Sequence, residues 1–547
     1  MAFSSAGGRR GTLSYHKCVP SGVIINITLS TEVTATANTP RRKFFLSALV
    51  VTLSTLILRL LDTVFGVWIS NRLGPQGIGL YQLVTSVYGF AVTFSISGLS
   101  FAVTMAVSSA CAGKQRPFRA VTACALLSLA YSLSAAAVLF FGAGYISLNW
   151  LGDIRAALSL KVFAFALPFL AFSACLRGYF IASRKALRSV AGDALEQFAR
   201  MAVITAFITL LLPPDIEHAC CAVVIGSLAS ELCSFVFYFL SYLADKRRCT
   251  LPVSGCAQPG LLRSILRISV PVALGAYLRS ALVTAENLLI PRGLSLYGLS
   301  SAEALSQYGL VKGMSLPVLL FPSSIIASFA LLLVPEVAQT NLSGDARHIS
   351  AMASRALQAT FLYSLLFAGS FACFGRRLGE LLYPGSGAGR YIFILAPVIP
   401  MFYIDFVVDN LLKALGHQVT SLKFNTIDAF FRTLLVLALL PFTGTAGYVL
   451  IIYAGSALNA ALSLAKLLRV SGVRLDIRRW LLLPALCSAL SGSVSLLLSR
   501  FLPSTTIFFA ISIMINIILY ISLLYITHSI TRSDIIWFCS PFRRRLK

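Results

Sequence analysis

The hydrophobic positions of this chain form long apolar runs that short polar segments separate. Most runs have 20 to 30 residues, and roughly 20 apolar residues in a helix are enough to cross a bilayer. The alternation of apolar and polar residues that is typical of a lipid-facing β-barrel is absent. The pattern therefore predicts an all-α integral membrane protein with about fourteen transmembrane helices. The predicted spans are residues 44–70, 80–111, 120–147, 157–182, 193–212, 218–243, 264–291, 305–335, 351–374, 391–415, 420–441, 445–468, 480–500 and 505–528.

The composition agrees with a membrane protein. Of the 547 residues, 57% are hydrophobic and 12% are charged, whereas about 25% of the residues in a soluble domain are charged. The formal net charge of +26 would suit a nucleic-acid partner if the basic residues formed one surface. They cluster instead in alternate interhelical segments, a pattern that reports membrane orientation. We therefore expect no binding of nucleic acid.

The distribution of Lys and Arg predicts the topology. Segments on the same side as the N-terminus, including the leader and the C-terminal tail, contain 32 of the 45 basic residues, and segments on the opposite side contain 8. Segments rich in Lys and Arg stay in the cytoplasm. Both termini are therefore expected to be cytoplasmic.

The chain also repeats itself at a shift of 232 residues. The pair Glu196 and Arg200 aligns with Asp428 and Arg432, and an acid followed four residues later by Arg is a favourable helical pair. The two copies are six spans apart, an even number, so both halves cross the membrane in the same sense. Repeats of this kind are typical of secondary transporters, whose substrate site lies between the halves.

The repeat predicts two homologous halves of parallel topology. A basic cytoplasmic leader, expected to be disordered, precedes them. The predicted divisions are the leader at 1–43, an N-lobe with spans 1 to 6 at 44–243, a cytoplasmic linker at 244–263, a C-lobe with spans 7 to 12 at 264–470, and spans 13 and 14 with a basic cytoplasmic tail at 471–547.

Three stretches carry a resemblance to a known family. They are LGPQGIGLYQ at 73–82, SGLSFAVTMAVS at 97–108 and LRGYFIASRKALRSVAGDALEQFARM at 176–201. Over roughly residues 44–530 the chain resembles the SpoVB-like polysaccharide flippases of the multidrug/oligosaccharidyl-lipid/polysaccharide exporter superfamily, which includes the lipid II flippases. The resemblance implies two pseudo-symmetric six-helix lobes that form a V-shaped cavity, with two additional C-terminal helices. It also implies alternating access and an undecaprenyl-pyrophosphate-linked cell-wall precursor as cargo.

Charged residues inside the apolar spans are the candidates for the wall of such a cavity. A charge at the bilayer centre costs from about 3 to over 10 kcal/mol unless it is paired or faces water. Arginine gives bidentate contacts to phosphate and lysine acts as a point charge, so these residues are predicted to bind substrate. The alternative is that they form internal ion pairs, such as one between Arg59 and Asp62. The predicted cavity residues are Arg59 and Asp62 in span 1, Arg279 and Glu286 in span 7, and Lys312 in span 8.

Two further groups of charges are interpreted differently. Asp405 and Asp409 share a helix face, and Na⁺ or a proton would relieve their repulsion, so they are a candidate site for a coupling ion. The alternative is an ion pair between Asp409 and Lys413. The repeated pairs are expected to brace helices and not to touch cargo; they are Glu196 with Arg200 and Asp428 with Arg432.

The sequence contains no nucleophile–base pair, phosphate-binding loop or zinc motif, so we expect a protein that is not an enzyme and has no cofactor or metal other than a coupling Na⁺ or H⁺. The expected function is that of a monomeric flippase of the bacterial inner membrane, whose partners are a lipid II-like lipid-linked oligosaccharide and membrane lipids. The resemblance places it in peptidoglycan or polysaccharide synthesis, with sporulation as one setting. The alternatives are a cation-coupled multidrug exporter of the same fold and a non-transporting membrane scaffold.

Overall fold

The computed structural model describes residues 39–112, 118–183, 185–211, 216–248, 261–499, 501 and 506–531. The predicted leader up to residue 38, most of the predicted linker and the tail after residue 531 lie outside the described residues. The chain divides into two compact units, Met1–Leu46 and Ser47–Lys547. In the first unit the described residues begin a helix; both predicted lobes lie in the second.

Every regular element of the described residues is helical, as the sequence predicts. The first half contains α1 (Thr39–Ile96), α2 (Leu99–Ala112), α3 (Phe118–Tyr145), α4 (Ala156–Ala182), α5 (Ala186–Ala206) and α6 (Ile216–Arg248). The second half contains α7 (Leu261–Leu296), α8 (Ser301–Tyr308), α9 (Leu316–Leu320), α10 (Ser323–Ser343), α11 (Ala346–Leu382), α12 (Ala388–Leu395), α13 (Ile399–Ala414), α14 (Gln418–Ser471), α15 (Leu483–Ser499) and α16 (Thr506–Ile526). A π-helical segment, Gly309–Ser315, joins α8 to α9.

The described residues contain ten helices that are long and apolar enough to cross a membrane. Two of them cover two predicted spans each: Gln418–Ser471 contains spans 11 and 12, and Leu53–Ile96 contains most of span 1 and the first part of span 2. Predicted span 2, residues 80–111, is broken at Gly98, which has φ 78° and separates α1 from α2. Helices α5 and α7 are not among the ten, and both carry charged residues within their apolar stretches. The number of helices is thus consistent with about fourteen crossings, and the protein is an all-α, multi-pass membrane protein.

A single glycine interrupts each of the two longest helices. Gly74 has φ 68° within α1, and Gly444 has φ 58° within α14. Side-chain-bearing residues rarely adopt these positive φ values, whereas glycine does so at little cost. The breaks fall between predicted spans 1 and 2 and between spans 11 and 12. The sequence predicts that the first helix stops at residues 71–75, and the non-helical Gly74 confirms a break there, so α1 consists of two helices, as α14 does around Gly444.

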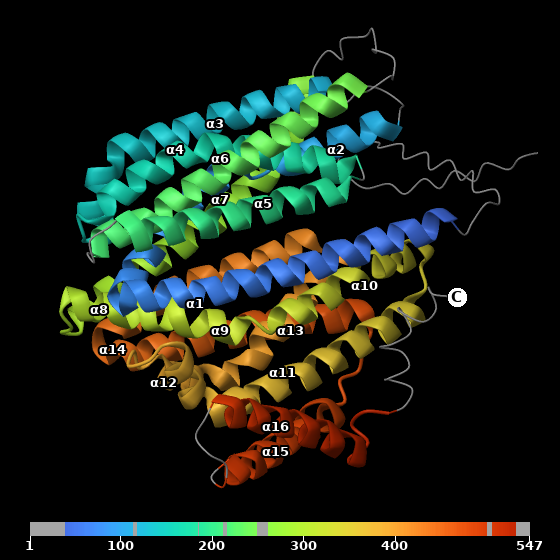
Figure 1. Ribbon diagram of the computed structural model, residues 1–547. Helices are drawn as coiled ribbons and strands as arrows, with labels where there is room; N and C mark the ends of the chain where they lie inside the picture. The colour runs from blue at the N-terminus through green and yellow to red at the C-terminus, as the bar shows by residue number, and fades with distance from the viewer. Residues whose placement is uncertain are drawn as a thin grey trace, which may run out of the picture. The chain divides into compact units, whose positions relative to one another are not determined.

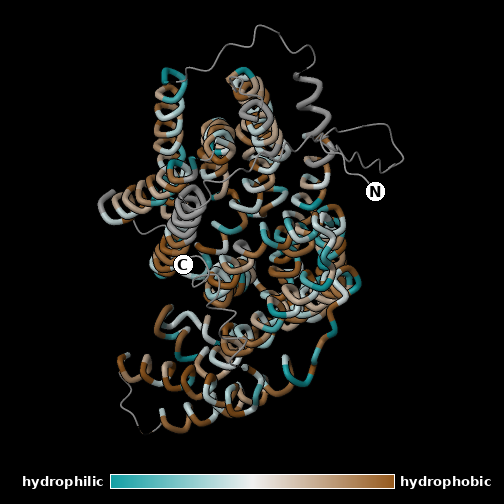
Figure 2. The backbone as a smooth tube through the Cα atoms, turned by 90° about the vertical axis from the view of Figure 1, so that its right-hand side faces the viewer, coloured by the Kyte–Doolittle hydropathy of each residue, from teal (hydrophilic) through white to brown (hydrophobic). Residues whose placement is uncertain are grey.

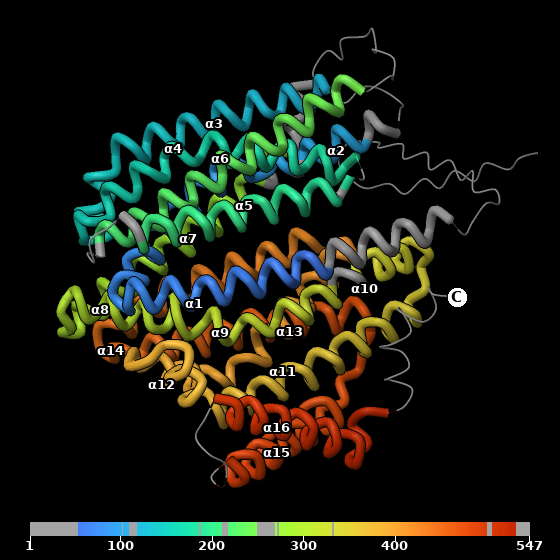
Figure 3. The backbone as a smooth tube through the Cα atoms, viewed as in Figure 1, coloured from blue at the N-terminus to red at the C-terminus, as the bar shows by residue number. Residues whose placement is uncertain are grey.

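The helices of the second unit form two groups (Figure 1). In the first, α4 packs against α3 and α6, and α6 packs against α5. In the second, α13 packs against α10, α11 and α14, and α7 lies along α14 while also touching α2 and α3. Helices α15 and α16 pack on each other and against α11, as the red end of the tube in Figure 3 shows.

The interior and the surface are both largely apolar. Leu80, Leu167 and Tyr403 are fully buried, while large side chains such as Phe141 and Phe442 are exposed. Figure 2 shows hydrophobic residues along the length of the helices. Since a soluble protein rarely exposes large contiguous apolar surface, exposed aromatic residues on these helices are suited to contact with lipid tails.

Candidate functional site

The first span carries two exposed charges among exposed apolar residues. Arg59 and Asp62 lie on the part of α1 before Gly74, and both are exposed. Leu60 and Val64 beside them are also exposed, so this half of α1 is little covered by other helices. The predicted pair between Arg59 and Asp62 does not form. Within the described part of the chain, the Arg59 side chain makes no ion pair.

Asp62 is held by residues of α5. The Gln197 amide donates a hydrogen bond to Asp62 Oδ1 at 3.1 Å, and Arg200 Nη2 lies 3.7 Å from the same oxygen. The Arg200 guanidinium also donates to the amide oxygen of Gln197. Gln197 is buried, so it is a fixed support for a more exposed acid and base.

Among the described residues, Glu196 and Arg200 do not form the direct ion pair that the repeat predicts, although Arg200 acts electrostatically on Glu196. Glu196 pairs with Arg177 of α4, whose Nη2 lies 3.3 Å from Glu196 Oε2. Arg177 Nη2 also lies 2.9 Å from Asp193 Oδ1. Because α4 and α5 are in contact, Arg177 can reach Glu196, the acid that local spacing alone would assign to Arg200. Arg177 falls inside the predicted span 157–182, but no local pattern in the sequence pairs it with acids of the next helix.

The corresponding pair in the second half has the geometry that its spacing predicts. Arg432 Nε lies 2.9 Å from Asp428 Oδ1 and 3.0 Å from Oδ2, and Arg432 Nη2 donates to Ser456 Oγ at 3.3 Å. Gly455 leaves room for this arrangement, because a Cβ at that position would overlap Arg432 Nε. The Asp428–Arg432 pair is therefore enclosed between two segments of α14.

The other predicted cavity residues lie near this pair. Arg279 is exposed on α7, while Glu286 and Lys312 are partly exposed. Arg432 and Lys312 both act electrostatically on Glu286, and Arg279 acts on Asp428. The structure thus gathers the charges of α7, the π-helical segment and α14 in one region.

Asp405 and Asp409 have separate partners. Lys413 Nζ lies 2.5 Å from Asp409 Oδ2, which is the alternative arrangement for this acid, and Ser421 donates to the other Asp409 oxygen. Asp405 accepts a hydrogen bond from Asn459 at 2.8 Å. Among the described residues, no group of three or more His, Cys, Asp or Glu side chains is arranged to hold a metal ion.

Close backbone contacts join the two halves. The segment of α1 after Gly74 lies against α7, where Tyr277 Oη donates to the Phe94 carbonyl at 3.1 Å and Thr284 Oγ1 donates to the Ser86 carbonyl at 3.1 Å. It also touches the π-helical segment, since a Cβ at Gly309 would overlap the Pro75 carbonyl oxygen. The two halves therefore meet along α1. At Gly309 the two backbones touch with no side chain between them.

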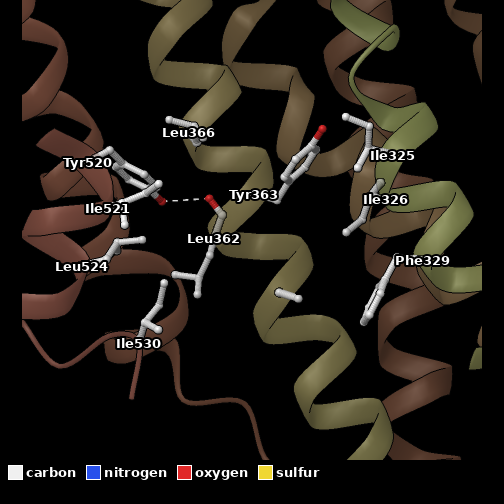
Figure 4. A pocket seen from close by; sticks show the side chains of 11 residues that line it. Ile325, Ile326, Phe329, Leu362, Tyr363, Leu366, Tyr520, Ile521, Leu524 and Ile530 are labelled. Atoms are coloured by element: carbon white, nitrogen blue, oxygen red, sulfur yellow. Dashed lines mark hydrogen bonds between the residues drawn. The ribbon is translucent and has the colours of Figure 1, made fainter. Parts of the chain in front are cut away.

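An apolar cavity of about 330 Å³ lies between α10, α11 and α16 (Figure 4). The side chains of Leu362 and Leu524 are buried at its wall, and those of Ile325 and Ile521 are exposed at its rim. Tyr520 donates a hydrogen bond to the Leu362 carbonyl at 2.8 Å, which fixes α16 against α11. The sequence does not predict this apolar groove, because α16 is far along the chain from the consecutive helices α10 and α11 that form the rest of its wall.

Comparison with known proteins places the chain in a family. Residues 46–340, just over half of the chain, match the model of the family described as polysaccharide biosynthesis protein. The chain belongs to this family. Its relatives include stage V sporulation protein B of Bacillus subtilis (strain 168), which is 24% identical over 471 residues that cover 83% of this chain and 90% of that protein. The uncharacterized membrane protein YabM of the same strain is 24% identical over 460 residues, covering 82% and 84% of the two chains.

Solved structures with a similar fold are membrane transporters. The lipid II flippase MurJ in an inward closed conformation matches this member of the polysaccharide biosynthesis protein family with a TM-score of 0.67 and 12% identity, over 88% of this chain and 99% of that chain. An inward-facing multidrug resistance MATE transporter matches with a TM-score of 0.55 and 16% identity, over 78% and 99%. The predicted superfamily fold is thereby confirmed.

Proposed function

We propose that this protein is a flippase that moves an undecaprenyl-pyrophosphate-linked precursor of the cell wall or of a polysaccharide across the cytoplasmic membrane by alternating access. The observation that carries the proposal is Arg59, an exposed arginine within an apolar span that makes no ion pair with any described residue. The family and the fold of the protein support a transport function.

The cost of an unpaired charge supports a role in binding. An arginine in the membrane is stable when it faces water or a counterion and is expensive when it faces hydrocarbon. A guanidinium is suited to bidentate contact with phosphate, and pyrophosphate would supply the missing negative charge. Arg279 on α7 is also exposed, so each half contributes one arginine to the proposed headgroup site.

The apolar groove supports a lipid-linked cargo. It has hydrophobic walls, and its rim residues Ile325 and Ile521 are exposed. Burial of apolar groups contributes about 0.8 kcal/mol for each CH₂, so an isoprenoid tail would gain free energy there only where it fits better than in the surrounding lipid. We propose that the tail lies against this groove while the headgroup enters the charged region.

A transport assay tests the function. Purified protein is reconstituted into liposomes that contain a fluorescent undecaprenyl-pyrophosphate saccharide, and a membrane-impermeable quencher reports the leaflet that holds the dye. Wild-type protein is expected to move the lipid. Arg59→Ala and Arg279→Ala are each expected to lose at least about tenfold in rate, because a charge-assisted hydrogen bond is worth about 1.5–3 kcal/mol.

Arg347→Ala is the matched control, because Arg347 is an exposed arginine at the start of α11. It should transport as wild type does. Full activity in both single variants and in the Arg59→Ala/Arg279→Ala double variant would refute the proposed headgroup site. Transport of cationic dyes without transport of the lipid would favour a multidrug exporter, which the MATE-like fold also accommodates, and no transport of either by well-folded protein would favour a scaffold.

A further inference from the structure

We propose that Arg200 is a third, releasable contact for the phosphate headgroup, and that it exchanges its neighbour Asp62 for phosphate when cargo binds. This inference rests on the proposed function. It assigns a binding role to a residue whose place in the repeat predicts a structural one.

The two halves treat the equivalent arginine differently. Arg432 is locked by both oxygens of Asp428 at 2.9 and 3.0 Å, and the two side chains are only 17% and 13% exposed. Arg200 lacks the corresponding partner, because Glu196 pairs with Arg177. Its only carboxylate contact among the described residues is Asp62 at 3.7 Å, and these side chains are 33% and 57% exposed. The repeat therefore has one fixed arginine and one weakly held arginine.

Gln197 holds the weakly held arginine in position. Its buried amide accepts a hydrogen bond from Arg200 and donates one to Asp62. The amide oxygen accepts a hydrogen bond from Nη2 of the guanidinium. Because the contact with Asp62 is long, other N–H donors of Arg200 stay available. A guanidinium has five such donors, so Arg200 can keep Gln197 and still bind a phosphate oxygen.

Electrostatic interactions favour the exchange of Asp62 for phosphate at Arg200. Exposed ion pairs contribute about 0.2–1 kcal/mol, so Arg200 can leave Asp62 at small cost. The pyrophosphate of the proposed cargo carries more negative charge in total than one carboxylate and accepts bidentate contacts. Asp62 and Arg59 are three residues apart and share one side of α1, so phosphate that binds Arg59 approaches Asp62 and repels it. Binding would thus detach α1 from α5 at this point.

Binding of a defined probe tests the proposal. The affinity of purified protein in nanodiscs is measured for undecaprenyl pyrophosphate and for undecaprenol, and the ratio of the two affinities isolates the headgroup contribution. Arg200→Gln is expected to reduce this ratio about tenfold or more. Arg200→Lys should retain part of the ratio, because the charge remains. Arg347→Gln, at an exposed arginine at the start of α11, is the control and should change the ratio by less than about twofold.

Asp62→Asn gives a change in the opposite direction. Because it removes the competing carboxylate, it is expected to raise the affinity for undecaprenyl pyrophosphate about two- to fivefold. A purely structural Asp62–Arg200 contact predicts instead that Asp62→Asn and Arg200→Gln both weaken binding or leave it unchanged. Asp62→Asn also keeps the inference testable if Arg200→Gln does not fold.

The outcomes separate the two proposals. If wild-type protein binds undecaprenyl pyrophosphate no better than undecaprenol, the proposed headgroup site fails and this inference fails with it. If wild-type protein prefers the pyrophosphate and Arg200→Gln has the same preference, the proposed function stands and the role of Arg200 is refuted.

Discussion

The buried carboxylate of Asp245, near the end of α6, pairs with Lys185, which lies between α4 and α5, and with Arg188 in the first turn of α5. Removing the acid or its partners is predicted to destabilise the protein by different amounts. Lys185 Nζ and Arg188 Nη1 each lie 2.5 Å from an oxygen of Asp245, and Tyr179 Oη lies 3.5 Å away. The Asp245 side chain is 4% exposed, whereas those of Lys185 and Arg188 are 42% and 36% exposed. The acid therefore depends on its partners more than they depend on it.

This asymmetry sets the expected order of destabilisation. Removal of one partner of a buried ion pair costs about 3–5 kcal/mol when the remaining charge cannot reach water. In Asp245→Asn the remaining cations can hydrate, so we expect about 2 kcal/mol. In Lys185→Ala the acid keeps Arg188, and the cost should be about 1 kcal/mol. In Lys185→Ala/Arg188→Ala a buried carboxylate stays unpaired, and the cost should reach at least about 3 kcal/mol.

Equilibrium unfolding in detergent micelles, followed by pulse proteolysis, measures these differences. Glu336→Gln, at an exposed position on α10, serves as the control and should stay within about 0.5 kcal/mol of wild type. Equal effects of the single and double cation variants, or a double variant as stable as wild type, would show that the buried acid does not depend on these two bases.

Three further predictions concern packing. Gly309→Ala forces the backbones of α1 and the π-helical segment apart, so it should destabilise the protein by about 1–3 kcal/mol in the same assay; wild-type stability would mean that this contact is not close-packed. Ala359→Phe fills the apolar groove and should slow transport of an undecaprenyl substrate more than that of a short-tailed analogue, whereas equal slowing would argue against tail binding there. Gly455→Ala should displace the Arg432 guanidinium and lower the thermal stability, and a crystal structure with the Asp428 pair intact would contradict this.

Hydropathy predicts the helices of this protein well because the membrane acts on each span separately. An apolar run of sufficient length must cross the bilayer as a helix, whatever its neighbours are. The positions of Gly74 and Gly444 also follow from local chemistry, since polar residues and glycine interrupt the apolar pattern there. The breaks at both glycines agree with the predicted boundaries between spans 1 and 2 and between spans 11 and 12.

Ion-pair partners are harder to predict, because they depend on which helices are neighbours. Spacing places Arg432 one turn from Asp428, and the two side chains do meet. The same spacing applies to Glu196 and Arg200, but Arg177 arrives from α4 and pairs with the acid. The apolar groove has the same origin, because no local pattern brings α10, α11 and α16 together.

The glycine kinks affect how topology can be mapped in living cells. Reporter tags are usually inserted between predicted spans, and residue 74 or 444 would be a natural choice. At either site an insertion would separate two helical segments that a single residue now joins, so the fusion would report a damaged protein. The turn at Gly152, which a left-handed glycine forms after α3 and where a Cβ would meet no other atom, is a safer position for an epitope.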